Sequence, residues 1–506
     1  MRAFVRYDQF SFIPAGRLLL ASLAILCVSC SSRPTGYGAT EKNITARGGI
    51  VGEAGLFHDI VYNPEAIGLT FPGYIVGLDK GRQAAVIGDA VLPAPRDSDI
   101  EAIRDFKTRL NTEPKLHYIS HVVRNEGRPY GNGNCILYSI YRDWGSGEKG
   151  MSFSENEVDR NFGCGGDFPI FGRPASAFPD SWTGLDVLAK ELERQFSERD
   201  AASAYTQAIV IVMGWNTPQL EAVRNFNSVL SHLQRAAGPD FRPLVIGVTW
   251  ASSWSANWLE PLVTLSSYRA KANDADEIGF TWLAEVVRVV QQTTAGRIPT
   301  VAIGHSFGAR ALATALCMGS QIERSSLGQE PSKSQARRSV PWNLFIAWQG
   351  AFSINRFGKG SSEGFKYDGH CGDIGAIVLT SSSHDQANTK SSWSDTVGSY
   401  EVFRQFCGEG KFGSFNRLDV QCIRREEISA EGGHRFRFTA GMPNYVDASN
   451  IVYFNQPNTG GGAHSDIFRP IHGRFIWAAI QSLEWTPPGS HRTQQRTATE
   501  PSSSRP

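Results

Sequence analysis

The spacing of apolar residues changes repeatedly along the chain beyond its N-terminal part. Short runs rich in β-branched residues, typical of buried strands, occupy 207–212, 242–250 and 298–303. Two intervening segments repeat apolar residues every three or four positions, as on one face of a helix; they cover 219–233 and 277–292. The pattern therefore predicts strand, helix, strand, helix and strand, in that order.

The alternation continues toward the C-terminus. Residues 309–316 follow the third strand and are predicted to form a helix, and further strand candidates lie at 343–348, 375–381 and 450–456. Alternating strands and helices predict an α/β fold with a mostly parallel sheet that helices cover on both faces. In such a sheet the active groups collect on loops at the carboxyl ends of the strands.

The segment 46–200 gives a weaker pattern. It contains short mixed stretches that look like strands, separated by loops rich in Gly, Pro and Asn, and one plausible helix at 184–194. A chain of 506 residues is long enough for more than one domain. We therefore expect an N-terminal mixed α/β segment of unassigned fold, followed by an α/β domain over 204–485.

The first 29 residues are predicted to be a signal peptide. Arginines precede an apolar run at 18–29 that is too short to span a bilayer comfortably. The run ends before Cys30 in a sequence that resembles the lipobox of bacterial lipoproteins, which implies lipidation of Cys30 and a polar tether over 30–45. A plain signal peptide cut nearby and a short uncleaved anchor are the alternatives. The Ser, Thr, Arg and Pro content of 486–506 predicts a disordered tail.

Cysteine usage agrees with export. Removal of Cys27 with the signal and lipidation of Cys30 leave six cysteines, an even number that suits up to three disulfides in an oxidising compartment. Cys407 and Cys422 are the closest pair in sequence and the easiest to imagine bridged. We expect a cell-envelope protein anchored to a membrane by its N-terminal lipid, on the periplasmic face. A soluble periplasmic or secreted protein is the alternative.

Composition and charge narrow the class of partner. Hydrophobic residues at 41% and charged residues at 20% are typical of an ordinary globular protein. The formal net charge of +1 gives no electrostatic reason to expect nucleic acid or a strongly acidic partner. No Cys-x-x-Cys pair occurs after the signal segment, so a metal site has little support. No metal or cofactor is expected.

The pattern Gly-x-Ser-x-Gly, which marks a nucleophilic serine in one large enzyme fold, occurs at 304–308 and at 360–364. Roughly half a match arises by chance in a chain of this composition and length, so the context decides. The chemistry requires a strand entering the serine and a helix leaving it, because the sharp turn between them exposes the hydroxyl. Ser306 has both neighbours, whereas Ser362 lies in a glycine-rich loop. Ser306 is therefore the predicted nucleophile.

Three stretches that each follow a predicted strand carry a family resemblance. They are MGWNT at 213–217, VTWASSW at 248–254 and GHSFGAR at 304–310. Together they resemble the alpha/beta-hydrolase superfamily, and more narrowly a poorly characterised bacterial group of serine esterases or lipases. The resemblance covers about 204–483 and implies the alpha/beta-hydrolase fold. Met213 departs from the pattern, since the group usually has a histidine there.

The resemblance implies a triad in the chain order serine, acid, histidine. His464 lies in a glycine-rich loop between the strand candidate at 450–456 and a predicted helix, which makes it the expected base. His472 falls inside that helix, where packing or surface exposure is the simpler interpretation. In such a triad the histidine takes the proton of the serine, and a carboxylate holds the imidazole in the right tautomer.

The acid of the triad is expected directly after the strand candidate at 375–381, where Asp385 lies. His384, beside it, is interpreted as a solvated or hydrogen-bonded loop residue. The competing carboxylates, interpreted as soluble loop or capping residues, are Asp368, Asp373, Asp395 and Asp447.

The same resemblance assigns the oxyanion hole to two backbone N–H groups, those of Phe307 and Trp215. Because the donors are backbone groups, the side chain of Met213 has little bearing on them. One interpretation of the nearby tryptophans is a pocket for an apolar group, and the alternative is packing. These tryptophans are Trp215, Trp250, Trp254 and Trp258.

The sequence therefore predicts a serine hydrolase that cleaves a carboxylic ester, or a related acyl bond, of a small molecule or lipid. The reaction would pass through an acyl-serine intermediate formed by Ser306, His464 and Asp385. Peptidases and thioesterases use the same machinery and stay open as activities. The alternative is a catalytically inactive envelope lipoprotein that uses the fold for binding, since fold alone does not decide function.

Overall fold

A computed structural model describes the parts of the chain that carry the predicted core and site. The described residues are 68–80, 117–128, 133–139, 163–164, 177–198, 205–215, 217–252, 271–294, 296–322, 324, 341–358, 367, 371–390, 395–408, 418–428, 436–455 and 461–483. The predicted signal peptide, Cys30, the tether and the tail lie outside them. Among the described helices, none is both long and apolar enough to cross a membrane.

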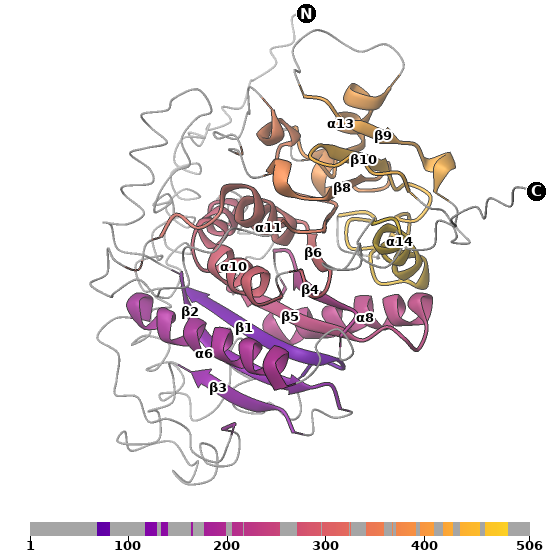
Figure 1. Ribbon diagram of the computed structural model, residues 1–506. Helices are drawn as coiled ribbons and strands as arrows, with labels where there is room; N and C mark the ends of the chain where they lie inside the picture. The colour runs from indigo at the N-terminus through magenta and orange to yellow at the C-terminus, as the bar shows by residue number, and fades with distance from the viewer. Residues whose placement is uncertain are drawn as a thin grey trace, which may run out of the picture.

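A ten-stranded sheet forms the centre of the described structure, in the order β3-β2-β1-β5-β4-β6-β7-β8-β10-β9 (Figure 1). All neighbours from β1 to β9 along this order are parallel, and β2 runs antiparallel to β1 and β3. The predicted α/β class and mostly parallel sheet are thus confirmed. The strands are β1 (Pro72–Lys80), β2 (His117–Glu126), β3 (Cys135–Ser139), β4 (Gln207–Val212), β5 (Pro243–Trp250), β6 (Thr300–His305), β7 (Leu344–Trp348), β8 (Ala376–Ser381), β9 (Gln421–Ile423) and β10 (Pro443–Asp447).

The central strands are continuous apolar runs because helices cover both faces of the sheet. On one face α6, α10 and α11 enclose one hydrophobic cluster, and on the other α8 packs against α14 over a second cluster (Figure 1). The helices are α6 (Ala177–Glu198), α8 (Gln219–Ala237), α10 (Trp282–Thr294), α11 (Phe307–Met318), α12 (Ala387–Lys390), α13 (Tyr400–Cys407) and α14 (Pro470–Gln481).

The N-terminal segment without an assigned fold contributes to this same sheet. β1 pairs in parallel with β5 from Gly73 opposite Val245 to Leu78 opposite Trp250. α6 packs on β2 and also reaches α10, where the rings of Trp182 and Trp282 are 5.0 Å apart. The strands before residue 204 therefore share a core with the strands after it.

One sequence-based element assignment is wrong, and a second is confirmed except for a break in the helix. No strand forms over 450–455, the described part of the strand expected at 450–456. β10 ends at Asp447, and the Asp447 carboxylate accepts hydrogen bonds from the backbone N–H and the hydroxyl of Ser449, which turns the chain. The apolar side chains of Ile451 and Val452 are buried in that turn rather than in a strand. The helix expected at 277–292 is interrupted at Thr281, between a helical stretch over 271–280 and α10.

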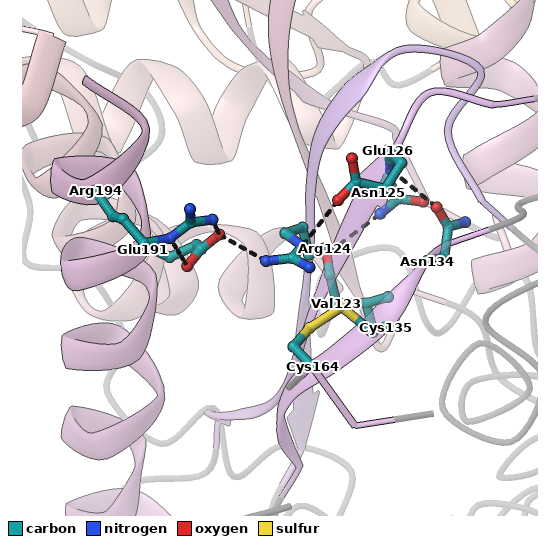
Figure 2. Close-up of a disulfide and its surroundings, with 9 residues drawn as sticks. All are labelled: Val123, Arg124, Asn125, Glu126, Asn134, Cys135, Cys164, Glu191 and Arg194. Carbon is teal, nitrogen blue, oxygen red and sulfur yellow. Dashed lines mark hydrogen bonds and ion pairs between the residues drawn. A yellow bond between two sulfur atoms is a disulfide. The ribbon is translucent and has the colours of Figure 1, made fainter. Parts of the chain in front are cut away.

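All six cysteines expected to remain in the mature chain are paired, which confirms that three disulfides form. Cys407 is bonded to Cys422, as their spacing indicated, and the other pairs are Cys317–Cys371 and Cys135–Cys164. Figure 2 shows Cys135–Cys164 at the edge strand β3, beside the Arg124 side chain, which lies between the carboxylates of Glu126 and Glu191. This disulfide holds a short neighbouring segment against β3, where the Cys164 N–H donates to the Ile136 carbonyl over 3.1 Å.

Candidate active site

Ser306 occupies a sharp turn between β6 and α11. Its φ angle is 54°, in the left-handed region that non-glycine residues adopt at a cost of about 1–3 kcal/mol and that occurs often at functional sites. Neighbouring backbone groups fix the turn, because the Ser306 N–H donates to the Trp348 carbonyl at 2.9 Å and the Ser306 carbonyl accepts from the Ala351 N–H at 3.2 Å. The strand before Ser306 and the helix after it confirm the predicted context of this motif. Ser362 of the second motif lies outside the described residues.

Three glycines make this turn possible, because neighbouring segments approach them too closely to leave room for a side chain. A Cβ on Gly304 would lie 2.5 Å from Ala309 Cα, and a Cβ on Gly308 would lie 2.4 Å from the Val212 carbonyl oxygen. A Cβ on Gly214 would lie 2.7 Å from Ser306 Cβ. The loop that follows β4 is therefore packed directly against the serine turn.

Buried Asp385 and half-buried His464 form a pair at the same edge of the sheet as Ser306. Their strands, β8 and β10, run parallel to β6, so the loops that follow these strands meet at one edge. His464 Nδ1 lies 2.9 Å from Asp385 Oδ2, and Asp385 is only 1% exposed. The sequence prediction that these two side chains come together is borne out by this distance.

The Asp385 and His464 loops are joined along their backbones. The Gln386 N–H donates to the Gly461 carbonyl at 3.0 Å, and the Ala463 N–H donates to the His384 carbonyl at 2.8 Å. A carboxylate can only accept, so His464 Nδ1 must carry the hydrogen, which leaves the lone pair on Nε2. The imidazole is thus held in the tautomer that a general base requires.

The His305 ring connects this pair to the serine turn. His305 Nε2 lies 2.9 Å from the His464 carbonyl oxygen, and the two imidazole rings are 4.9 Å apart. Burial, and then the positive charge that His464 can carry, lower the pKa of His305 to about 3, so its ring is neutral at pH 7. Among the described contacts, no hydrogen bond joins Ser306 Oγ to the His464 ring. In known serine hydrolases the hydrogen bond between serine and histidine is often long before substrate binds.

The backbone N–H groups expected to hold an oxyanion belong to two segments in contact. Phe307 begins α11, and its ring lies 6.4 Å from that of half-buried Trp215 in the loop after β4. Met213 is buried in the core, and its carbonyl oxygen accepts the indole N–H of Trp250 at 2.9 Å. Trp250, the last residue of β5, is therefore a buried packing residue against this loop, while Trp254 and Trp258 lie outside the described residues.

The competing candidates occupy other positions. Asp373 precedes β8 and so lies at the opposite edge of the sheet from Ser306. The Asp395 carboxylate accepts from the Asn355 side chain, and that of Asp447 holds the turn after β10. His384 is exposed; His472 is buried in α14 with Nε2 2.8 Å from the Ile451 carbonyl oxygen. Asp368 lies outside the described residues.

The helix after Ser306 is anchored by a buried ion cluster that the sequence did not reveal. Arg310, in its first turn, and Arg356 each contact both carboxylate oxygens of Asp276 at 2.6–3.1 Å. Burial alone would raise the pKa of Asp276, but the two positive charges outweigh it and keep the pKa below its usual value. Two segments far apart in sequence are thereby fixed to the serine helix.

Sequence reasoning also missed Asn388, which is 4% exposed. Its Nδ2 lies 2.7 Å from Asp385 Oδ2, and its backbone N–H donates to Asp385 Oδ1 at 3.1 Å. The spacing of an aspartate and an asparagine three residues later was a visible signal, since such pairs are common in turns. His305 was visible as the residue before Ser306, but its contact with His464 crosses 159 positions.

No group of three or more His, Cys, Asp or Glu side chains among the described residues is arranged to hold a metal ion. Comparison of the chain with known protein families, curated proteins and solved structures finds no match.

Proposed function

We propose that the protein is a serine hydrolase of the alpha/beta-hydrolase type that cleaves a carboxylic ester or a related acyl bond. The observation that carries the proposal is the Asp385–His464 hydrogen bond, in a loop that the His305 contact joins to the strained Ser306 turn. The three residues follow β6, β8 and β10 in the chain order serine, acid, histidine. The strained backbone at Ser306, the hydrogen-bonded acid–base pair and their shared sheet edge favour a catalytic site over a packed core.

Each residue has a defined task in the proposed reaction. His464 Nε2 takes the proton of Ser306 Oγ as that oxygen attacks the acyl carbon, and Asp385 stabilises the resulting imidazolium. The N–H groups of Phe307 and Trp215 donate to the oxyanion of the tetrahedral intermediate. Collapse of the intermediate transfers the proton to the departing alcohol and leaves an acyl-serine. Water, deprotonated by His464, then attacks the acyl carbon, and the proton returns to Ser306 as the acid is released.

The proposed location is the cell envelope, with a lipid on Cys30 and an ester of a small molecule or lipid as substrate. Three disulfides support this location, because disulfides persist in oxidising compartments and are rare in the cytosol. A soluble periplasmic or secreted enzyme is the alternative. Mass measurement of the mature N-terminus distinguishes the two, since only the anchored form carries a diacylglyceryl group on Cys30.

Hydrolysis of p-nitrophenyl butyrate by the purified protein tests the activity. We expect Ser306→Ala, His464→Gln and Asp385→Asn each to lower kcat by about 10⁴-fold or more, because each breaks a unit that acts together. The matched controls are Ser362→Ala, in the other Gly-x-Ser-x-Gly sequence, and His384→Ala, beside Asp385; both are expected to keep wild-type kcat. A folded wild-type protein without esterase, thioesterase or peptidase activity would instead favour the non-catalytic binding protein.

A further inference from the structure

Two hydrogen-bonded paths connect the Ser306 turn with the acid–base pair. The shorter path runs through the side chain next to the nucleophile, where His305 Nε2 meets the His464 carbonyl oxygen at 2.9 Å. An oxygen acceptor requires that His305 Nε2 carry the hydrogen. The neutral ring of His305 thus donates to the backbone of the proposed base.

The second path leaves Ser306 on its other side and runs through the end of β7. The Ser306 N–H donates to the Trp348 carbonyl, and the next residue, Gln349, has a φ angle of 45°. The Gln349 N–H donates to Thr380 Oγ1 at 3.0 Å, and its carbonyl oxygen accepts from Asn388 Nδ2 at 3.0 Å. Gln349, in its left-handed conformation, therefore joins the end of β7 to the loop that carries Asp385.

The amide of Asn388 has its orientation fixed by these neighbours. Its two Nδ2 hydrogens serve two acceptors, Asp385 Oδ2 at 2.7 Å and the Gln349 carbonyl oxygen at 3.0 Å. The 3.3 Å approach of Nδ2 to His464 Nδ1 is then a contact between two donors rather than a hydrogen bond. A Cβ on Gly398 would lie 2.1 Å from Nδ2, so the Gly398 backbone packs directly against the Asn388 amide.

We propose that the two paths close into a ring in which His305 and Asn388 are positioning residues for the triad of Ser306, Asp385 and His464. The inference rests on the proposed function. Asn388 holds the carboxylate of Asp385 toward His464, while His305 holds the backbone of the His464 loop against the serine turn. A shift of about 1 Å between reacting groups can lower the rate about 100-fold. We therefore expect loss of either positioning residue to lower the rate by about this factor.

Substitutions that keep bulk but remove the donors test the ring in steady-state ester hydrolysis. His305→Leu and Asn388→Leu are expected to lower kcat about 100-fold while KM changes by less than about twofold. His305→Gln retains an amide N–H close to the place of Nε2 and is expected to recover most of kcat. Recovery by the conservative variant distinguishes positioning from packing alone.

Two buried residues elsewhere supply matched controls. His472 also places its Nε2 against a backbone carbonyl, that of Ile451, and Asn444 Nδ2 donates to the Ile377 carbonyl at 3.0 Å. Neither contacts Ser306, Asp385 or His464 in the described structure. The His472 ring lies 5.4 Å from that of Trp348, but the second path uses the Trp348 carbonyl and not its side chain. His472→Leu and Asn444→Leu are expected to lower stability but to keep kcat per folded molecule. Wild-type kcat in His305→Leu and Asn388→Leu, or a loss explained by unfolded protein alone, would overturn the ring.

A measurement without turnover separates this inference from the proposed function. The His464 Nδ1 proton gives a far-downfield signal in proton NMR when it is bound to Asp385, and its exchange with water reports how firmly the pair is held. We expect this signal to weaken or disappear in His305→Leu and Asn388→Leu and to persist in His305→Gln and Asn444→Leu. If the wild type has no esterase, thioesterase or peptidase activity but the signal follows this order, the proposed function is wrong and the positioning by His305 and Asn388 is supported. If the wild type is active but the signal is unchanged in His305→Leu and Asn388→Leu, the proposed function holds and only the positioning role of His305 and Asn388 is refuted.

Discussion

Two buried histidines, His305 and His472, hold neutral rings against backbone carbonyls. Burial is the main cause that lowers the pKa of His305 to about 3 and that of His472 to about 4, below the value of about 6.5 for a free histidine. The unfolded chain therefore binds more protons than the folded chain below about pH 6.5. Their contribution to stability is complete above that pH and is lost as the pH falls toward the folded values.

The pH dependence of unfolding gives a prediction at the scale of one residue. Each of these histidines should lower the free energy of unfolding by up to about 1.4 kcal/mol per pH unit between about pH 6 and pH 4.5. His472→Gln keeps an N–H donor and does not titrate, so its slope should be smaller by about that amount. Urea unfolding at several pH values in this range measures the slope, and equal slopes for the two proteins would contradict the assignment.

At the scale of elements, the ion cluster around Asp276 fixes the serine helix. Helical residues 271–280 supply the carboxylate, α11 supplies Arg310, and Arg356 comes from the short helical turn Ile354–Phe357. Because all three side chains are buried, water cannot replace a lost partner. The disulfide Cys317–Cys371 adds a covalent link from α11 to the segment just before β8.

Asp276→Asn should therefore be strongly destabilising. Removal of the negative charge leaves two buried guanidinium groups facing each other, and we expect a loss of about 3–5 kcal/mol in the free energy of unfolding. Asp186→Asn is the matched control, since Asp186 pairs with Arg324 at 2.6 Å but its side chain is 40% exposed. Loss of that partly exposed pair should cost at most about 1 kcal/mol. Similar losses in the two variants, measured by urea unfolding, would contradict the role of the cluster.

At the scale of the molecule, a single sheet joins the N-terminal strands to the strands that carry the site. β1 covers β5, and the antiparallel strands β2 and β3 extend the sheet beyond it (Figure 1). Without them, β5 would become an unpaired edge, with a row of open backbone groups and an apolar face exposed. The N-terminal strands thus protect the half of the sheet next to the proposed oxyanion loop.

A chain that begins at residue 204 should consequently fail to form a stable native state. We expect it to aggregate or to lack the near-ultraviolet circular dichroism of packed aromatic residues, because Trp282 loses Trp182 and β5 loses β1. The full-length chain should unfold cooperatively across this boundary. A soluble, natively packed 204–506 fragment would show that the segments before and after residue 204 are independent.

The sequence revealed those features that local rules determine. The serine turn was predictable because its chemistry demands a strand, small neighbours and a helix in succession, and the order of Asp385 and His464 followed from the family resemblance. Contacts that cross long stretches of sequence were not predictable, such as His305 with His464 or Arg310 with Asp276. The last strand was misplaced because a buried turn and a buried strand have the same apolar composition. Likewise, the pairing of β1 with β5 leaves no local signal in either strand.

Covalent labelling is the sharpest test of whether Ser306 is an activated nucleophile. The folded protein is treated with a fluorophosphonate, and the modified peptide is identified by mass spectrometry in the wild type, Ser306→Ala and Ser362→Ala. We expect one adduct on Ser306 in the wild type and in Ser362→Ala, and none in Ser306→Ala. Folded wild-type protein that takes up no label, or that carries the label on another serine, would contradict this role of Ser306.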